Sequence, residues 1–172
     1  SYLYKQAADL VISKDNGDIE RKFFKDDFSV DSSSQYIGDV ANFTWDTANR
    51  QLKYTGITNS KGIITKEVFT DGKIDFTFAF PTAYTTGNLW LKFEIASANP
   101  STRPSGGLVL YLVRSVSGTL SAAIYDYIAN KRLAIATSMT MDIGENVHVT
   151  IIKNANQFKV YLNGLLKIST TY

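Results

Sequence analysis

The side chains best suited to chemistry in this sequence are aromatic residues flanked by charged ones. Trp90, Lys92 and Glu94 alternate with apolar residues along 89–95, so a strand would carry these three side chains on one face. A sugar ring has apolar C–H faces and a rim of hydroxyls, which an aromatic platform with flanking hydrogen-bonding groups can hold. The pattern predicts a carbohydrate-binding surface, and the competing interpretation is that the other sheet or a loop covers this face.

Two tyrosines extend the same argument. Tyr125 and Tyr127 lie two residues apart, so a strand would present both on one face. If they converge with Trp90 on one sheet, the three rings would form a binding groove. The loop 99–107, which carries Arg103, would then close one end of that groove. The alternative is that each tyrosine belongs to the core and only its hydroxyl reaches the rim.

The only histidine is a further candidate. His148 lies in the alternating apolar stretch 146–152. We include it among the candidate ligand-binding residues. A histidine that is simply hydrogen-bonded on a sheet face is the more ordinary interpretation, because one histidine seldom forms a site alone.

These candidates need strands to position them, and the sequence predicts strands from about residue 43 onward. The apolar residues of 74–80 share one face by alternation, and the run 107–115 is nearly continuously apolar, as in a strand covered on both faces. Further strands are expected at 119–128, 146–152 and 157–162. Asn163-Gly164 is the strongest two-residue hairpin signal. Many short strands separated by turn clusters predict an all-β sandwich or barrel.

Length and charge limit the possible functions. The chain has 172 residues, which is typical of one domain, and its 18 basic and 16 acidic side chains are interspersed, which argues against a nucleic-acid partner. It has no run of about 18 apolar residues, so no membrane-spanning helix is predicted. We expect residues 1–22 to form an N-terminal arm or linker and residues 23–172 to form the domain. Only 2–11 has a spacing compatible with a helix.

Two parts of the sequence resemble a known family. They are Asp26-Asp27-Phe28-Ser29 followed by 43–52, 62–65 and 76–80, and then 145–152 followed by 158–164. In order and spacing they resemble the concanavalin A-like, laminin G-like jelly-roll domains, over roughly residues 24–168. The resemblance implies a two-sheet antiparallel β-sandwich with Trp45 in the core and His148 in the hairpin motif. Val147 departs from the family, which often has tryptophan at that position.

The end of the chain also departs from the resembled family. Such domains usually have one more strand, which pairs with the first strand, whereas this sequence stops eight residues after Gly164. Either the segment 1–22 supplies that strand, or the domain is truncated or inserted into a larger protein. We expect a module excised from a larger assembly.

Catalysis is not expected from these residues. Endoglucanases of the resembled superfamily carry carboxylates at Glu-x-Asp-x-x-Glu spacing on one strand, since retaining hydrolysis needs two of them about 5–5.5 Å apart. This sequence has no such spacing, no cysteine, and no phosphate-loop or dinucleotide fingerprint. We therefore expect neither an enzyme nor a cofactor.

A structural calcium ion is the remaining inorganic possibility, since some members of the resembled superfamily hold calcium with loop carboxylates. Asp26, Asp27 and Asp31 are oxygen ligands of suitable hardness, but no spacing motif supports them. A solvated acidic turn is the favoured interpretation, and no metal site is predicted.

The leading prediction is a non-catalytic carbohydrate-binding module for cell-surface or cell-wall polysaccharide. As the resemblance implies, such modules occur in phage tail and baseplate proteins and in bacterial surface proteins. We therefore expect a virion or an extracellular location, with a bacterial glycan and other subunits as partners. The alternative is a structural or protein-interaction domain without a sugar site, which would pack on its neighbours through an open edge strand. An unusual glycoside hydrolase is disfavoured by the missing carboxylate pattern.

Overall fold

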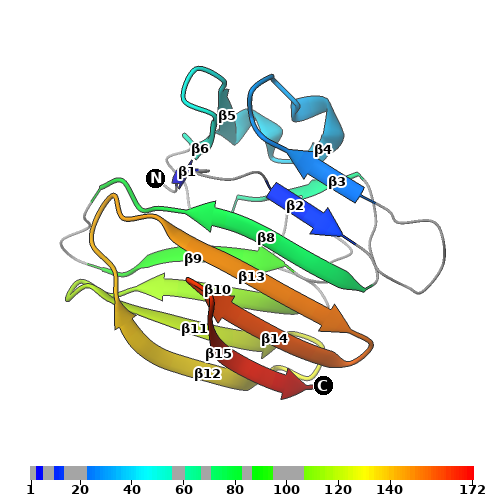
Figure 1. The fold of residues 1–172 in the computed structure, drawn as a ribbon, viewed down its shortest axis with the longest axis vertical. Coiled ribbons are helices and arrows are strands. Elements are labelled where there is room, and N and C mark those ends of the chain that lie inside the picture. Colours follow the sequence, from blue (N-terminus) through cyan, green and yellow to red (C-terminus); the bar gives the residue numbers. More distant parts are fainter. Residues whose placement is uncertain are drawn as a thin grey trace.

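Figure 1 shows the computed structural model of the chain, which describes residues 3–5, 10–13, 23–55, 61–66, 71–82, 87–94 and 107–172. The strands are β1 (Leu3–Lys5), β2 (Leu10–Ser13), β3 (Phe23–Asp26), β4 (Tyr36–Gly38), β5 (Phe43–Asp46), β6 (Gln51–Tyr54), β7 (Ile63–Thr65), β8 (Gly72–Phe78), β9 (Leu89–Glu94), β10 (Leu108–Arg114), β11 (Thr119–Asp126), β12 (Lys131–Thr140), β13 (Val147–Asn154), β14 (Gln157–Leu162) and β15 (Leu165–Thr171). Two short 3-10 helices, η1 (Ser33–Gln35) and η2 (Val40–Asn42), flank β4. Within these residues, no helix has the length and apolar character needed to cross a membrane.

Two antiparallel sheets form the body of the molecule. One has the strand order β12-β11-β10-β9 and the other has the order β15-β14-β13-β8-β2-β3. Both contribute to one main core, whose fully buried side chains include Leu110 and Ile124 from the four-stranded sheet and Phe78 and Phe158 from the six-stranded sheet. The expected all-β, two-sheet antiparallel sandwich is confirmed.

Alternation along the strands decides which side chains enter the core. Val147, Val149 and Ile151 are buried along β13, and the residues between them are only partly buried. The pattern of β11 is the same, with Leu120 and Ile124 among its buried residues. Each fully buried aliphatic side chain contributes about 1.5–3 kcal/mol of transfer free energy, which holds the register of both sheets. The intervening side chains are thereby placed on the outer faces.

The N-terminal half of the chain adds a smaller layer of strands, seen at the top of Figure 1. It consists of the sheet β1-β6-β5 and the pair β4-β7. A second hydrophobic cluster contains Phe24 of β3 and Tyr36 of β4. Trp45 packs against this cluster, and its ring centroid lies 5.5 Å from that of Tyr36. Trp45 is half-buried in this cluster and does not enter the main core.

The two ends of the chain differ from the sequence expectations. A helix over 2–11 is wrong at the described positions, because β1 pairs with β6 and β2 lies between β8 and β3. The residues after Gly164 form β15, which pairs with β14 at the edge of the six-stranded sheet. Segment 1–22 thus contributes a strand next to the first strand of the resembled pattern, while the domain division at residue 22 stays a prediction.

The Asn163-Gly164 hairpin is confirmed. Asn163 and Gly164 have φ angles of 48° and 79°, the left-handed pair that a tight two-residue turn requires. By contrast, the residue pattern does not predict β12, whose 134–136 stretch is rich in alanine, a residue of low strand preference. Pairing with β11 places this segment in the sheet despite its composition.

Candidate functional site

Strand register brings aromatic side chains together on the outer face of the four-stranded sheet. Tyr111 on β10 lies directly opposite Lys92 on β9 and Ala123 on β11. Trp90 and Tyr125 are each two residues along from those partners, so they are diagonal neighbours of Tyr111, within reach of aromatic side chains. The pairing therefore produces an aromatic line across three strands.

The rings of this line are in contact. Trp90 and Tyr111 lie nearly perpendicular with centroids 5.7 Å apart, and Tyr111 and Tyr125 do so at 6.5 Å. Tyr127 lies 4.8 Å from Tyr125 and 6.4 Å from Tyr111. We call Trp90, Tyr111, Tyr125 and Tyr127 the aromatic cluster. The Nζ atom of Lys92 lies 5.5 Å from the centroid of the Tyr111 ring, within the range of a cation–π contact.

The turn between β11 and β12 holds one end of the aromatic cluster. The Tyr125 hydroxyl donates to Oδ1 of Asn130 at 2.7 Å, and the Tyr127 N–H donates to the carbonyl of Gly107 at 3.0 Å. Asp126 Oδ1 accepts from the backbone N–H groups of residues 128 and 129. A register shift between Ile124 and Tyr125 lies next to these groups, and such irregularities re-aim the side chains beside them.

The outer face of the four-stranded sheet is covered at one end and exposed at the other. Val109, which lies opposite Tyr125 and alternates with the core residues of β10, has no exposed surface, whereas Trp90 is 40% exposed. The three tyrosines are half-buried and Lys92 is exposed. The Tyr111 hydroxyl has no hydrogen-bond partner within the residues that the structure describes. This surface can stack on a flat, partly apolar ligand and exchange hydrogen bonds with its polar groups.

The structure brings together four of the predicted site residues: Trp90, Lys92, Tyr125 and Tyr127. Glu94 lies at the end of β9 with its backbone opposite Val109, and its place in the binding surface stays a prediction. Arg103 lies outside the described residues, as does most of the loop expected to close the groove.

Tyr111 belongs to the aromatic cluster although the residue pattern does not predict it as a site residue. It lies in a nearly continuous apolar run, where alternation between a polar and an apolar face is hard to see. The local signal for it was weak, because a single tyrosine in an apolar run is compatible with either face. Its place between Lys92 and Ala123 follows from the pairing of three strands, which the sequence does not show.

His148 is not part of this surface, because it lies on β13 in the other sheet. Its Nε2 is 3.4 Å from Oδ1 of Asp75, the same oxygen that accepts a 2.6 Å hydrogen bond from the Thr150 hydroxyl. Lys73 Nζ lies 3.0 Å from the other Asp75 oxygen. We call Lys73, Asp75, His148 and Thr150 the Asp75 network. The arrangement agrees with a histidine that is paired on a sheet face, and a ligand-binding role of His148 stays a prediction.

The three acidic residues considered for calcium are engaged in local hydrogen bonds. The buried Asp26 accepts from the Tyr36 hydroxyl at 2.7 Å, from Ser32 and from the Phe28 N–H. Burial, together with the charge of Asp26, raises the pKa of the Tyr36 phenol well above its usual range. Hydrogen bonds from the serines two residues on lower the pKa values of Asp27 and Asp31. Among the described residues, no three acidic or histidine side chains gather as metal ligands.

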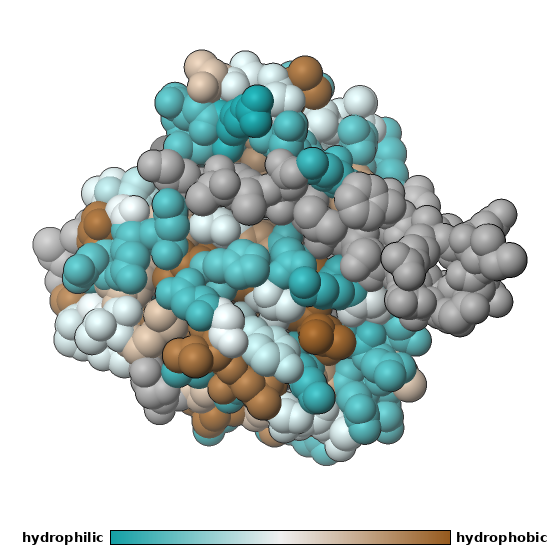
Figure 2. Space-filling model, in the orientation of Figure 1, coloured by the Kyte–Doolittle hydropathy of each residue, from teal (hydrophilic) through white to brown (hydrophobic). Residues whose placement is uncertain are grey.

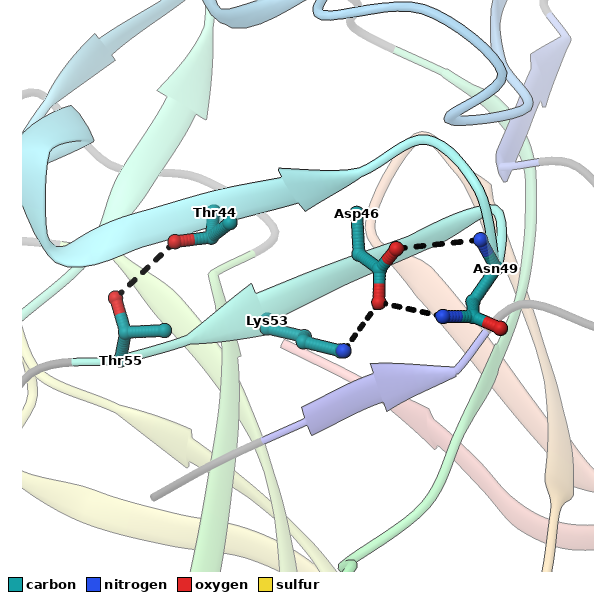
Figure 3. A network of polar contacts seen from close by, with 5 residues as sticks. All are labelled: Thr44, Asp46, Asn49, Lys53 and Thr55. Atoms are coloured by element: carbon teal, nitrogen blue, oxygen red, sulfur yellow. Dashed lines mark hydrogen bonds and ion pairs between the residues drawn. The ribbon is translucent and has the colours of Figure 1, made fainter.

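A second polar network lies on the β5–β6 hairpin, shown in Figure 3. Asp46 accepts hydrogen bonds from Lys53 and from both the backbone and the side chain of Asn49. The hydroxyl oxygens of Thr44 and Thr55 lie 3.4 Å apart and share a hydrogen bond. The bonds from Lys53 and Asn49 lower the pKa of Asp46 to about 2. Because these groups satisfy one another within a single hairpin, they stabilise the turn.

No protein-family model and no curated protein matches the sequence. Among solved structures, the chain is similar to the carbohydrate binding module CBM66 from Bacillus subtilis, with a TM-score of 0.58 and 12% sequence identity over 80% of each chain. At that identity the likeness concerns the fold. The two-sheet β-sandwich of this chain is thus the kind of fold that a known carbohydrate binding module has.

Proposed function

We propose that this chain is a non-catalytic carbohydrate-binding module that holds a glycan against the aromatic cluster and Lys92. The aromatic cluster is the observation that carries the proposal. Its rings lie on an outer sheet face, away from the main core, and Trp90 is 40% exposed. An exposed ring beside a lysine and tyrosine hydroxyls matches a ligand with apolar faces and a rim of hydroxyls. The fold shared with a carbohydrate binding module supports the same function.

A binding role fits this surface better than a catalytic one. Asp126, which separates Tyr125 from Tyr127, is occupied by two backbone N–H groups of the β11–β12 turn. Glycoside hydrolysis needs a pair of carboxyl groups on either side of the bond that breaks. The described outward side chains of β9, Trp90 and Lys92, include no carboxylate. Stacking and hydrogen bonding are what the described side chains can supply.

The ligand class and setting that we propose follow from the sequence resemblance. A polysaccharide on a bacterial cell surface is the proposed ligand. The proposed setting is a larger phage tail or bacterial surface protein, in a virion or outside the cell, where other subunits would be its neighbours.

A second candidate function, a structural or protein-interaction domain, is favoured by the edge strand β15. Leu165 and Leu166 at its start are 64% and 51% exposed, and β15 pairs with β14 on one side only. Figure 2 shows hydrophobic residues gathered in the lower part of the view, where Figure 1 draws β12, β14 and β15. An exposed edge with apolar side chains is able to pair with another chain.

Binding to a glycan array and to whole bacterial cells, with the native chain and a Trp90→Ala variant, tests the proposal. We expect specific binding by the native chain and its loss in the variant, with circular dichroism showing both chains folded. Binding that survives the substitution would keep the carbohydrate function and reject the aromatic cluster as its site. If the folded native chain binds no glycan and no cell, the result would contradict the proposal and favour the interaction domain.

A further inference from the structure

The rings of the aromatic cluster are not coplanar. The interplanar angle is 85° between Trp90 and Tyr111 and 82° between Tyr111 and Tyr125. Tyr127 is tilted by 59° from Tyr125 and by 44° from Tyr111. Neighbouring rings of the cluster thus point their faces in different directions.

Sheet twist is one source of this divergence. Adjacent strands of a sheet rotate by about 20–25°, so the outward directions on β9 and β11, two strands apart, differ by roughly 40–50°. Trp90 lies on β9 and Tyr125 on β11, with Tyr111 on the strand between them. Because the Trp90 and Tyr111 rings are 85° apart, a planar ligand that lies flat on Trp90 cannot also lie flat on Tyr111.

The surroundings of the tyrosines also limit their use as stacking platforms. Lys92 Nζ lies over the ring of Tyr111, and that ring is in contact with each of the three other rings of the aromatic cluster. Tyr125 is held by its hydroxyl bond to Asn130. Trp90 is the most exposed residue of the aromatic cluster, at 40%. One sugar can stack on Trp90 while the tyrosine hydroxyls and Lys92 meet its polar groups.

The surface of a crystalline polysaccharide makes the opposite demand. Its chains lie side by side in one plane, and several rings at one level must face it together to bind it. From the ring angles and the twist, we propose that the aromatic cluster takes a single glycan chain, as a soluble oligosaccharide or a protruding chain segment, and not the flat face of a crystalline polysaccharide. This inference rests on the proposed carbohydrate function and names the physical form of its ligand.

The test compares single chains with crystals of the same sugar. The native chain, Trp90→Ala and the control Tyr172→Ala are titrated calorimetrically with soluble glycans selected on an array, with cellohexaose and with chitohexaose. The same three proteins are incubated with microcrystalline cellulose and crystalline chitin, with and without the matching hexasaccharide as competitor. Tyr172 is a matched control because it is an aromatic residue, 53% exposed, that contacts Phe158 and not the cluster.

We expect binding to at least one soluble glycan, weakened roughly thirtyfold in Trp90→Ala and unchanged in Tyr172→Ala. We also expect the matching hexasaccharide to abolish any retention of the protein on the crystals. Retention on a crystal that resists this competition would overturn the inference while leaving the carbohydrate function standing. No binding to any glycan in either form, by folded native chain, would overturn the proposed function and the inference together.

Discussion

The outer faces of the two main sheets differ in how their side chains are satisfied. On the six-stranded sheet, the Asp75 carboxylate is shared by Lys73, His148 and Thr150, and hydrophilic residues cover the middle of the face seen in Figure 2. On the four-stranded sheet, aromatic rings contact one another and one of them, Trp90, is 40% exposed. Polar groups that satisfy one another add to stability, whereas an exposed aromatic surface retains the capacity to bind.

Trp90→Ala should have the largest effect of the substitutions, and that effect should be on glycan binding by the four-stranded face. A central tryptophan of a binding surface contributes about 2 kcal/mol or more, so glycan affinity measured by calorimetry should fall about thirtyfold. Loss of the ring contact with Tyr111 should lower the free energy of unfolding by no more than about 1.5 kcal/mol. Unchanged glycan affinity together with a large loss of stability would show that Trp90 serves the fold and not glycan binding.

Asp75→Ala tests the other face and should show the reverse pattern. Removing the carboxylate leaves the Thr150 hydroxyl and Lys73 without their acceptor, at a cost of about 1–1.5 kcal/mol in the free energy of unfolding. Urea unfolding measures this change, and glycan affinity should not change. Asp75→Asn is the matched variant, because it keeps an acceptor oxygen and should lose less. A fall in affinity in either variant would make the six-stranded face part of the binding site.

Tyr111→Phe sharpens the comparison within the aromatic cluster. The substitution keeps the ring contacts and removes a hydroxyl that has no partner among the described residues. The free energy of unfolding should therefore change by less than about 0.5 kcal/mol, while glycan affinity falls by a few-fold, as for one hydrogen bond. A clear loss of stability with full affinity would show that the hydroxyl serves the fold.

The smallest expected effect is the pH dependence of stability that Asp46 causes in the N-terminal layer. The folded-state pKa of Asp46 is lowered to about 2, chiefly by its hydrogen bond from Lys53. A lowered carboxylate pKa contributes stability above the unfolded-state pKa of about 4, and this contribution is lost as the pH falls toward 2. Asp46→Asn should therefore unfold with a shallower dependence on pH between about 4 and 2, measured by thermal unfolding. An identical pH profile in native chain and variant would contradict the assignment.

Much of the sandwich follows from the order of residues, because burial of one strand face requires alternation. The inward set of β8 and the outward positions of Trp90 and Lys92 both follow from the period of two. The Asn163-Gly164 turn follows from the left-handed φ angles that these two residue types tolerate. Strand β12 does not follow from the order of residues, because its alanines have little intrinsic strand preference. This segment enters the sheet by pairing with β11.

In the candidate site, too, some features follow from the local sequence and others depend on strand pairing. The sequence by itself determined that Trp90 and Lys92 share a face, because neighbours two apart on a strand always do. Only the tertiary structure decided that Tyr111 joins Trp90 to Tyr125 and that His148 lies on the other sheet with Asp75. Those relations depend on which strands pair, in which register and in which sheet. Pairing is set by long-range packing of the core, which leaves no local mark in the sequence.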